Sequence, residues 1–405
     1  MWRLIALIIG NVFEWYDFML FGALSSIIGV HFFSNTDIPR FATFIAAWGV
    51  FATGFFMRPF GGFVIGFLGD KYGRRYALLL SICAMALPSF LTGCIPSYST
   101  IGWWAPVILI LLRLLQGLSV GGELPGTMVA LVEGAPERSR CLNSVYAIMG
   151  IGAGLLTVTI VLTVLHLFFT EQQVVDWAWR IPFVGGVLLS GFGIIVRLLW
   201  KKPPFHSAIN FSQTLEGLFG SRKRLFKIVG IQLFPALSFN LVLIYTHPYL
   251  TNVLHHATLS REVIEFLLMG TFLIGLPIFG WVADRVGIKK VMIIGAVVAI
   301  VWSIPFYWLL RFDTFYLLIA IVPMVLAMCC YYGGVTVMMI DLIRQHIRYS
   351  SVALMHGLTF AIFAGTAPIV AAILIEHTGY TWAPGIYLGI GAIISLITTF
   401  SIREQ

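Results

Sequence analysis

Twelve long stretches of this 405-residue sequence run almost without Asp, Glu, Lys, Arg or His. A helix that crosses the hydrocarbon core of a bilayer needs about 20 mostly apolar residues, and these stretches meet that length. Prolines and a polar cluster in PSYSTIGWWAP separate the third stretch from the fourth. We therefore predict spans at residues 4–30, 41–68, 75–96, 104–132, 141–167, 178–200, 227–250, 263–283, 288–310, 314–340, 350–375 and 379–402.

Composition supports the same class of protein. Apolar residues make up 59% of the chain and charged residues only 10%, whereas a soluble domain carries about 25% charged residues. The apolar runs are continuous rather than alternating, which excludes a membrane β-barrel. The sequence thus predicts an all-α polytopic membrane protein.

The basic residues indicate its orientation. With both termini in the cytoplasm, 19 of the 25 Lys and Arg fall in inner loops and tails, among them Arg197. Four fall in outer loops: Arg40, Arg180, Arg261 and Arg311. Cytoplasmic loops carry such an excess of positive charge. The net charge of +8 is therefore explained by topology, and we expect no nucleic-acid partner.

An internal repeat divides the chain into two halves. GFLGDKYGRR (Gly66–Arg75) follows the second span, and GWVADRVGIK (Gly280–Lys289) follows the eighth, 214 positions later. Duplicated helical units around a central site characterise one transporter architecture. We predict an N-terminal six-helix bundle at 1–200, a cytoplasmic linker at 201–226 and a C-terminal six-helix bundle at 227–405.

Further motifs accompany the repeat in order along the chain: GNVFEWYDF, RPFGG, PSYSTIGWWAP, RLLQGLSVGGE, WAWRIPF and HIRYS. Together with GFLGDKYGRR they resemble the major facilitator superfamily and, within it, the metabolite:H+ symporter family. PSYSTIGWWAP and HIRYS most resemble the proline/betaine transporter branch, whereas citrate, α-ketoglutarate and shikimate carriers share the remaining motifs. The resemblance implies two pseudo-symmetric six-helix bundles that work by alternating access.

The resemblance also implies a function. It points to a proton-coupled symporter of a small carboxylate-bearing solute, with a proline/betaine-like zwitterion favoured. A di- or tricarboxylate or other organic acid, a facilitator or antiporter, and a non-transporting sensor are the alternatives. The expected partners are the solute, protons and the lipid of a bacterial-type cytoplasmic membrane, with the protein acting as a monomer. We expect no cofactor beyond the coupling proton, no metal and no enzyme activity, because nucleophile–base, HExxH and P-loop motifs are missing from the sequence.

Five charged residues lie inside predicted spans away from the span ends: Glu14, Asp17, Arg58, Arg113 and Glu123. A charge in the bilayer costs about 3 kcal/mol on insertion scales, so it usually faces a partner or a water cavity. Glu14 and Asp17 lie three positions apart on neighbouring parts of one helix face, which Asn11 extends. Two close carboxylates favour holding a proton, as a proton carrier must. A structural salt bridge to Arg58 or Arg113 is the alternative.

Each of the other charged residues in the spans is compatible with more than one role. Arg113 suits a substrate carboxylate, because a guanidinium keeps its charge and binds carboxylates bidentately. It also suits a carboxylate of the first helix when substrate is absent, or a permanent pair with Glu123 or Glu14. Glu123, in GGELPG, is a third proton-coupling candidate, and a packing role there is equally compatible. Arg58, before Pro59, indicates a conformational role.

The family resemblance implies that the repeated loops form a gate. Its expected residues are Gly66, Asp70, Gly73, Arg74 and Arg75, with Asp284, Arg285 and Arg58. Positive-inside anchoring alone would explain the arginines but not Asp70.

Uncharged polar residues in the spans are candidates for the solute site. With Asn11, they are Gln116, Tyr146, Asn240, Tyr245, Tyr331 and His356. Hydrogen bonding between helices is the alternative role for each of them.

Overall fold

The computed structural model describes residues 2–33, 49–50, 53–199, 210–255, 261–312 and 314–402. Within these ranges every regular element is helical. Arg40, residues 41–48 of the second predicted span and residues 201–209 of the predicted linker lie outside them. The main helices are α1 (Trp2–Ala23), α2 (Ser25–Phe33), α4 (Arg58–Lys71), α5 (Arg74–Cys94), α6 (Tyr98–Ile101), α7 (Trp104–Glu133), α8 (Arg140–Phe168), α9 (Glu171–Gln173), α10 (Arg180–Leu199), α11 (Phe211–Gly220), α12 (Arg222–Ser238), α13 (Thr246–Asn252), α14 (Arg261–Val286), α15 (Ile288–Leu309), α16 (Thr314–Asp341), α17 (Arg348–Thr359), α18 (Gly365–Thr378) and α19 (Pro384–Ser401).

Ten spans among the described residues are long and apolar enough to cross a membrane. An eleventh is formed if α1 and α2 count as one span, bent by 63°. This bend lies within the first predicted span, 4–30. It lies at Leu24, between Gly22 and Ser25, and both residue types favour helix ends or non-helical backbone.

The described residues contain three π-helical turns. Phe239–Ile244 and Phe360–Ala364 lie inside spans, and Val174–Ala178 precedes α10. The seventh predicted span, 227–250, accordingly consists of α12, the turn at Phe239–Ile244 and α13. Pro235 lies inside α12 just before this turn, where its missing N–H interrupts the helical hydrogen bonding.

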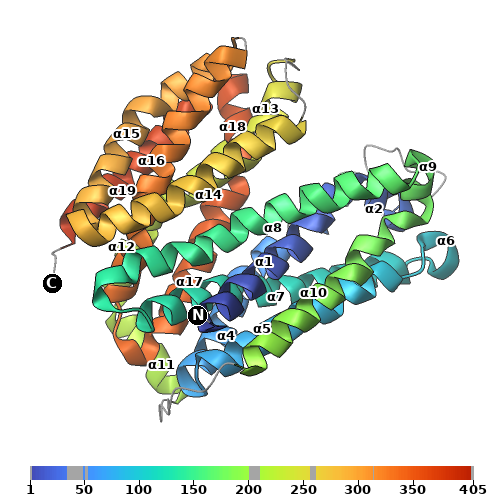
Figure 1. The fold of residues 1–405 in the computed structure, drawn as a ribbon, viewed down its shortest axis with the longest axis horizontal. Helices are drawn as coiled ribbons and strands as arrows, with labels where there is room; N and C mark the ends of the chain where they lie inside the picture. The colour runs from blue at the N-terminus through green and yellow to red at the C-terminus, as the bar shows by residue number, and fades with distance from the viewer. Residues whose placement is uncertain are drawn as a thin grey trace. The chain divides into compact units, whose positions relative to one another are not determined.

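The helices form two compact units. The first unit comprises Met1–Thr127, Ala153–Thr214 and Tyr349–Gly357, and the second comprises Met128–Gly152, Leu215–Arg348 and Leu358–Gln405. In the first unit α10 packs on α5 and α1, and α5 packs on α4. In the second unit α15 packs on α16 and α19, and α14 packs on α16 (Figure 1).

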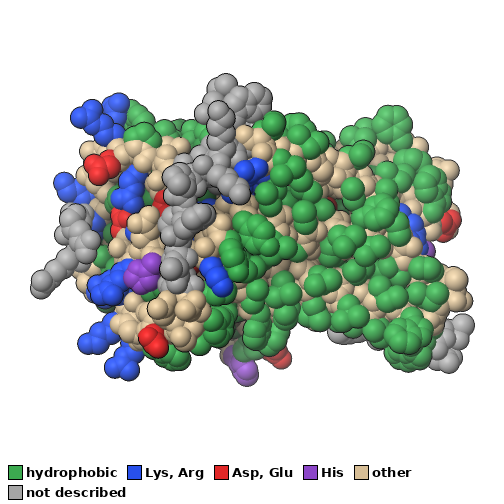
Figure 2. All heavy atoms as spheres, turned by 90° about the horizontal axis from the view of Figure 1, so that it is seen from below, with side chains coloured by type: hydrophobic (Ala, Val, Ile, Leu, Met, Phe, Trp, Pro, Cys, Tyr) green, Lys and Arg blue, Asp and Glu red, His purple; other side chains and the backbone are tan. Residues whose placement is uncertain are grey.

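The exposed side chains are largely apolar. Leu188 and Ile195 of α10 are 78% and 58% exposed, and broad hydrophobic areas cover the face in Figure 2. Contiguous apolar surface of this extent would be unfavourable in water and suits lipid. Several charged and polar side chains are instead buried between the helices.

Candidate functional site

Apart from Asp70, which is described below, six charged side chains are buried among the described residues of the first unit, and their formal charges balance. They are Glu14, Asp17, Glu123, Arg58, Arg113 and Arg197, each at most 4% exposed. Three acids facing three arginines reduce the cost of placing each charge away from water. Five of the six are predicted from the sequence, and Arg197 is the residue that sequence reasoning misses as a membrane charge.

Arg197 forms an ion pair with Glu123. Its Nη1 donates to Glu123 Oε2 at 3.0 Å, and its Nη2 donates to Oε1 of the same carboxylate. The contact is therefore bidentate, and the side chains are 0% and 1% exposed. Glu123 is thus partnered by α10 rather than by Arg113.

Glu14 lies on α1 beside this pair. Its Oε1 is 3.1 Å from the hydroxyl of Ser119 on α7, and its Oε2 is buried without a hydrogen-bond partner among the described residues. Glu123, Arg197 and Arg58 all interact with it electrostatically. Glu14 therefore faces a second acid, and this acid is Glu123 rather than Asp17, with which the sequence pairs it.

Asp17 faces another side of α1. A Cβ placed on Gly186 of α10 would lie 2.6 Å from Asp17 Oδ1, so this small residue makes room for the carboxylate. Arg113 interacts with Asp17 electrostatically, and the hydroxyl groups of Ser89 and Ser190 lie near its carboxylate. The sequence places Glu14 and Asp17 on one helix face, and in the structure their carboxylates have different neighbours.

Arg58 and Arg113 lie over the same aromatic ring. Their Cζ atoms are 4.7 Å and 4.6 Å from the centroid of Phe18. Arg113 is also 4.2 Å from Phe21, and its Nη1 donates to Gln116 Oε1 at 2.7 Å. Cation–π contacts stabilise a desolvated guanidinium without removing its charge. Two cations so close leave a strongly positive region next to Asp17.

The other predicted solute-site residues fall in both units. Asn11 and His356 are buried in the first unit, where His356 interacts electrostatically with Arg58. In the second unit Tyr331 donates to the Ile231 carbonyl at 2.9 Å, which is a helix–helix contact. There Tyr146 and Tyr245 are half-buried, and Asn240 lies in the π-helical turn and is 7% exposed.

Asp70 of the first repeat motif binds the start of α17. Tyr349 N donates to Asp70 Oδ1 at 3.1 Å, while Ser350 donates its N–H and hydroxyl to Oδ2 at 2.9 Å and 2.7 Å. Arg74 also contacts Oδ1, at 2.6 Å. A carboxylate at a helix N-terminus satisfies free N–H groups and the positive end of the helix dipole. The motif HIRYS is therefore a docking point for GFLGDKYGRR.

Glycines bring α4 and α17 into close contact. A Cβ on Gly66 would lie 2.6 Å from Ser350 Cα, and one on Gly62 would lie 2.6 Å from the Ala353 carbonyl oxygen. Gly73, which ends the loop, has φ +96°, a conformation that other residues rarely adopt.

The second repeat motif has a similar arrangement in the second unit. Asp284 accepts hydrogen bonds from Cys141 N at 2.8 Å and Leu142 N at 2.9 Å, at the start of α8. Gly287 has φ +110°. Ile288 stands where the first copy has Arg74, so this carboxylate lacks the corresponding arginine. Arg285 instead stacks on Trp281, 3.9 Å from the ring centroid.

The second unit holds two further ion pairs. Arg348 donates to Glu133 at 3.0 Å, and Arg140 binds Asp341 at 2.5 Å. Arg348 begins α17 and Arg140 begins α8, next to the residues that the two motif aspartates bind. Sequence reasoning assigns these arginines only to topology, and their acidic partners are 215 and 201 positions away.

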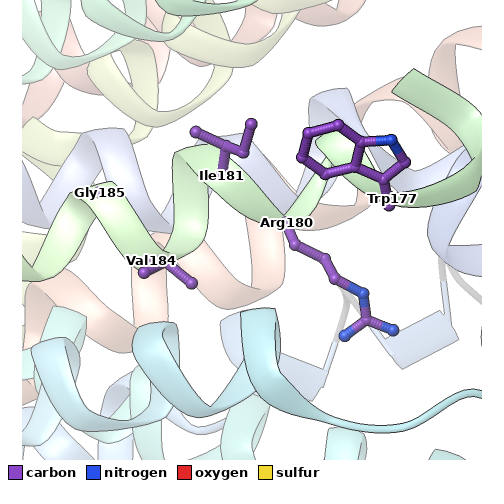
Figure 3. Close-up of a pocket in the computed structure, with 5 residues that line it drawn as sticks. All are labelled: Trp177, Arg180, Ile181, Val184 and Gly185. Carbon is purple, nitrogen blue, oxygen red and sulfur yellow. The ribbon is translucent and has the colours of Figure 1, made fainter. Parts of the chain in front are cut away.

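A shallow pocket opens on the surface of the first unit. Trp177, Arg180, Ile181, Val184 and Gly185 line it along α10 and the turn before it (Figure 3). Arg180 donates to the carbonyls of Gly93 and Ile95. Because its lining side chains are mainly apolar and half-exposed, the pocket suits lipid, and it does not include the six buried charges.

Family models match both halves of the chain. The model described as Sugar (and other) transporter matches residues 2–210, and the one described as Major Facilitator Superfamily matches residues 231–405. A proline/betaine transporter of Salmonella typhimurium is 31% identical over 98% of this chain and 82% of its own length. A shikimate transporter of Escherichia coli is 30% identical over 98% of this chain and 93% of its own length.

Solved structures agree with these matches. A proton:xylose symporter bound to 6-bromo-6-deoxy-D-glucose has a TM-score of 0.78 at 13% identity, over 98% of this chain and 94% of that chain. An Escherichia coli fucose:proton symporter has a TM-score of 0.70 at 16% identity, over 99% and 98%. At such low identity the likeness shows the fold alone, and it confirms the predicted all-α polytopic architecture.

Proposed function

The chain belongs to the major facilitator superfamily, and we propose that it is a proton-coupled symporter importing a small carboxylate-bearing solute by alternating access. Its family and relatives are membrane transporters rather than enzymes. A proline/betaine-like zwitterion is the favoured solute, in keeping with the name of the Salmonella relative.

One observation carries this proposal: Arg58 and Arg113 share the Phe18 ring beside Asp17. A fixed guanidinium attracts a carboxylate, and the carboxylate is supplied either by Asp17 or by the solute. When the solute carboxylate binds Arg113, negative charge is added next to the buried acids, and one of them accepts a proton more readily. Solute and proton binding thereby become linked.

We propose that the hydrogen bonds of Asp70 form the gate. They hold α17 against α4 through hydrogen bonds that rigid-body movement of α17 would break. We assign Gly66, Asp70, Gly73, Arg74 and Arg75 to this gate, and Asp284 with Arg285 to its weaker second copy.

Transport by the purified protein in proteoliposomes tests the proposal. An inward proton gradient should drive accumulation of labelled proline or glycine betaine, and a protonophore should abolish it. Arg311→Gln, an outer-loop substitution, is the control for general effects of removing an arginine. Accumulation that persists unchanged with the protonophore, or flux that only equilibrates the solute, would reject proton coupling.

An organic acid is the second candidate solute. The shikimate transporter relative is nearly as similar as the proline/betaine transporter, and Arg58 adds a second cation beside Arg113. Competition of proline, betaine, shikimate and dicarboxylates for uptake separates the two classes. We further propose that the protein acts as a monomer in a bacterial cytoplasmic membrane, with both termini in the cytoplasm.

A further inference from the structure

Glu14 and Glu123 are buried next to each other but have different hydrogen-bond partners, and those of Glu14 centre on Ser119. The hydroxyls of Ser81 and Ser119 form a reciprocal pair, in which Ser81 Oγ donates to the Ser119 carbonyl at 3.0 Å and Ser119 Oγ donates to the Ser81 carbonyl at 2.7 Å. Each hydroxyl has one hydrogen to donate. Ser119 Oγ therefore has the Ser81 carbonyl as an acceptor in competition with Glu14.

Glu14 Oε1 nevertheless lies 3.1 Å from Ser119 Oγ. Ser119 is the one hydrogen-bond partner of this carboxyl group among the described residues, and Glu14 Oε2 is buried without a partner there. A charged carboxylate would therefore lack the donors that it needs away from water, whereas a protonated Glu14 needs fewer of them. The geometry thus fits the neutral acid.

Glu123 has the opposite environment. Arg197 supplies two N–H donors to its two carboxylate oxygens, and Thr127 Oγ1 adds a third donor at 3.4 Å. Arg197 is itself held by the Leu78 carbonyl. Because a guanidinium cannot supply the proton, Glu123 remains a carboxylate.

The remaining charged and titratable groups around Glu14 do not change the conclusion that Glu14 is neutral and Glu123 is charged. Arg58 interacts with it from α4, and Tyr349 lies near both acids from α17, where its hydroxyl donates to the Gly122 carbonyl at 2.8 Å. The Tyr349 hydroxyl hydrogen is therefore directed at a backbone carbonyl. Asp17, the third acid of α1, has Arg113 as its charged neighbour.

We propose that Arg197 is a positioning residue for proton coupling, which holds Glu123 as a carboxylate and leaves Glu14, beside Ser119, as the group that takes up and releases the proton. This rests on the proposed symport. In each cycle one proton binds Glu14 and is released to water, while Arg197 and Glu123 keep their charges.

The same arginine connects this pair to the loop of the first repeat motif. Arg75 Nε donates to the Arg197 carbonyl at 3.0 Å, and Arg75 Nη2 donates to the Leu198 carbonyl at 2.6 Å. A movement of the loop therefore acts directly on the backbone that carries Arg197.

Infrared spectroscopy of the purified full-length protein tests this without transport. Wild type at neutral pH should show the C=O stretch of a protonated carboxyl group, which Glu14→Gln removes and Glu123→Gln retains. Asp17→Asn is the control for the third acid. Loss of this band in Glu123→Gln rather than Glu14→Gln would overturn the proposal.

Arg197 is tested in the same spectra. Arg197→Gln should add a second protonated carboxyl band, because Glu123 loses its counter-charge, and the double variant Arg197→Gln/Glu123→Gln should lack that second band. Arg197→Lys should show the wild-type spectrum. A merely structural arginine would change the melting temperature and leave the bands unchanged, which would refute the proposal. If Arg197→Gln does not fold, Arg197→Lys and the double variant remain decisive: an extra band in either rejects it.

Uptake separates this inference from the proposed function. If wild type shows the Glu14 band but no proton-driven uptake, symport fails and the assignment of the proton stands. If uptake is proton-driven but Glu14→Gln accumulates solute as wild type does, symport stands and the carrier is not Glu14.

Discussion

Ser350 donates both its backbone N–H and its hydroxyl to one oxygen of Asp70, 280 positions earlier in the chain. Asp284 makes a similar contact with two backbone N–H groups at the start of α8. The two copies of the repeated loop therefore share one task, which is to hold the first turn of a helix. They differ in their side-chain partners, because Asp70 also binds the Ser350 hydroxyl and Arg74.

Asp70→Asn should loosen the start of α17. A hydrogen bond to a charged group contributes about 1.5–3 kcal/mol, so amide exchange at Tyr349 and Ser350 should accelerate roughly tenfold or more. Asp284→Asn is the matched control, which should act on Cys141 and Leu142 instead. Hydrogen exchange with mass spectrometry distinguishes the two. Equal protection of α17 in Asp70→Asn and wild type would contradict a gate at this contact.

Gly66→Ala should separate α4 from α17. The added Cβ would lie 2.6 Å from Ser350 Cα, a distance that requires the backbone to move. Gly191→Ala is the matched control, because its Cβ would have no neighbour within 4 Å. Ala is preferred to Gly in a helix by about 0.5–1 kcal/mol, so the control should keep or raise the melting temperature. Gly66→Ala should lower it, and an unchanged value would mean that the close contact is not required.

The sequence predicts most of the fold because long apolar stretches and clustered basic residues are local signals. It also predicts five of the buried charges, since each interrupts an apolar stretch. Arg197 is not predicted as a buried charge because it lies near the end of a predicted span, where an arginine normally reaches the membrane interface. Only the packing of α10 on α5 and α1 reveals that it is 0% exposed and bound to Glu123.

The neighbours of Glu14 and Asp17 could not be predicted from the sequence either. A spacing of three positions predicts one face of α1, but not which helix each side chain meets. Glu14 reaches Ser119 of α7, while Asp17 meets Gly186 of α10. These contacts depend on packing between segments more than 100 positions apart, for which the sequence holds no local signal.

Two natural cysteines test the predicted topology. Cys94 is exposed at the end of α5, which the charge distribution places outside, and Cys83 is exposed within the same apolar helix. A membrane-impermeant maleimide added to intact cells should label Cys94. It should not label Cys83, because an impermeant reagent does not reach a thiol that faces lipid. Cys94→Ser should remove the label. Labelling of Cys94 only after the membrane is opened would reverse the orientation.

The prediction about solute binding concerns Arg113. Removing one member of a desolvated charge pair costs about 2–5 kcal/mol, so Arg113→Ala should weaken solute binding roughly thirtyfold or more. Arg113→Lys keeps the charge but loses the planar fork, so its affinity should lie between those of wild type and Arg113→Ala. Calorimetric titration of the solute identified by uptake measures all three, with Arg311→Gln as the control. A purely structural arginine would lower the melting temperature and leave affinity intact. Equal dissociation constants across the three proteins would remove Arg113 from the solute site.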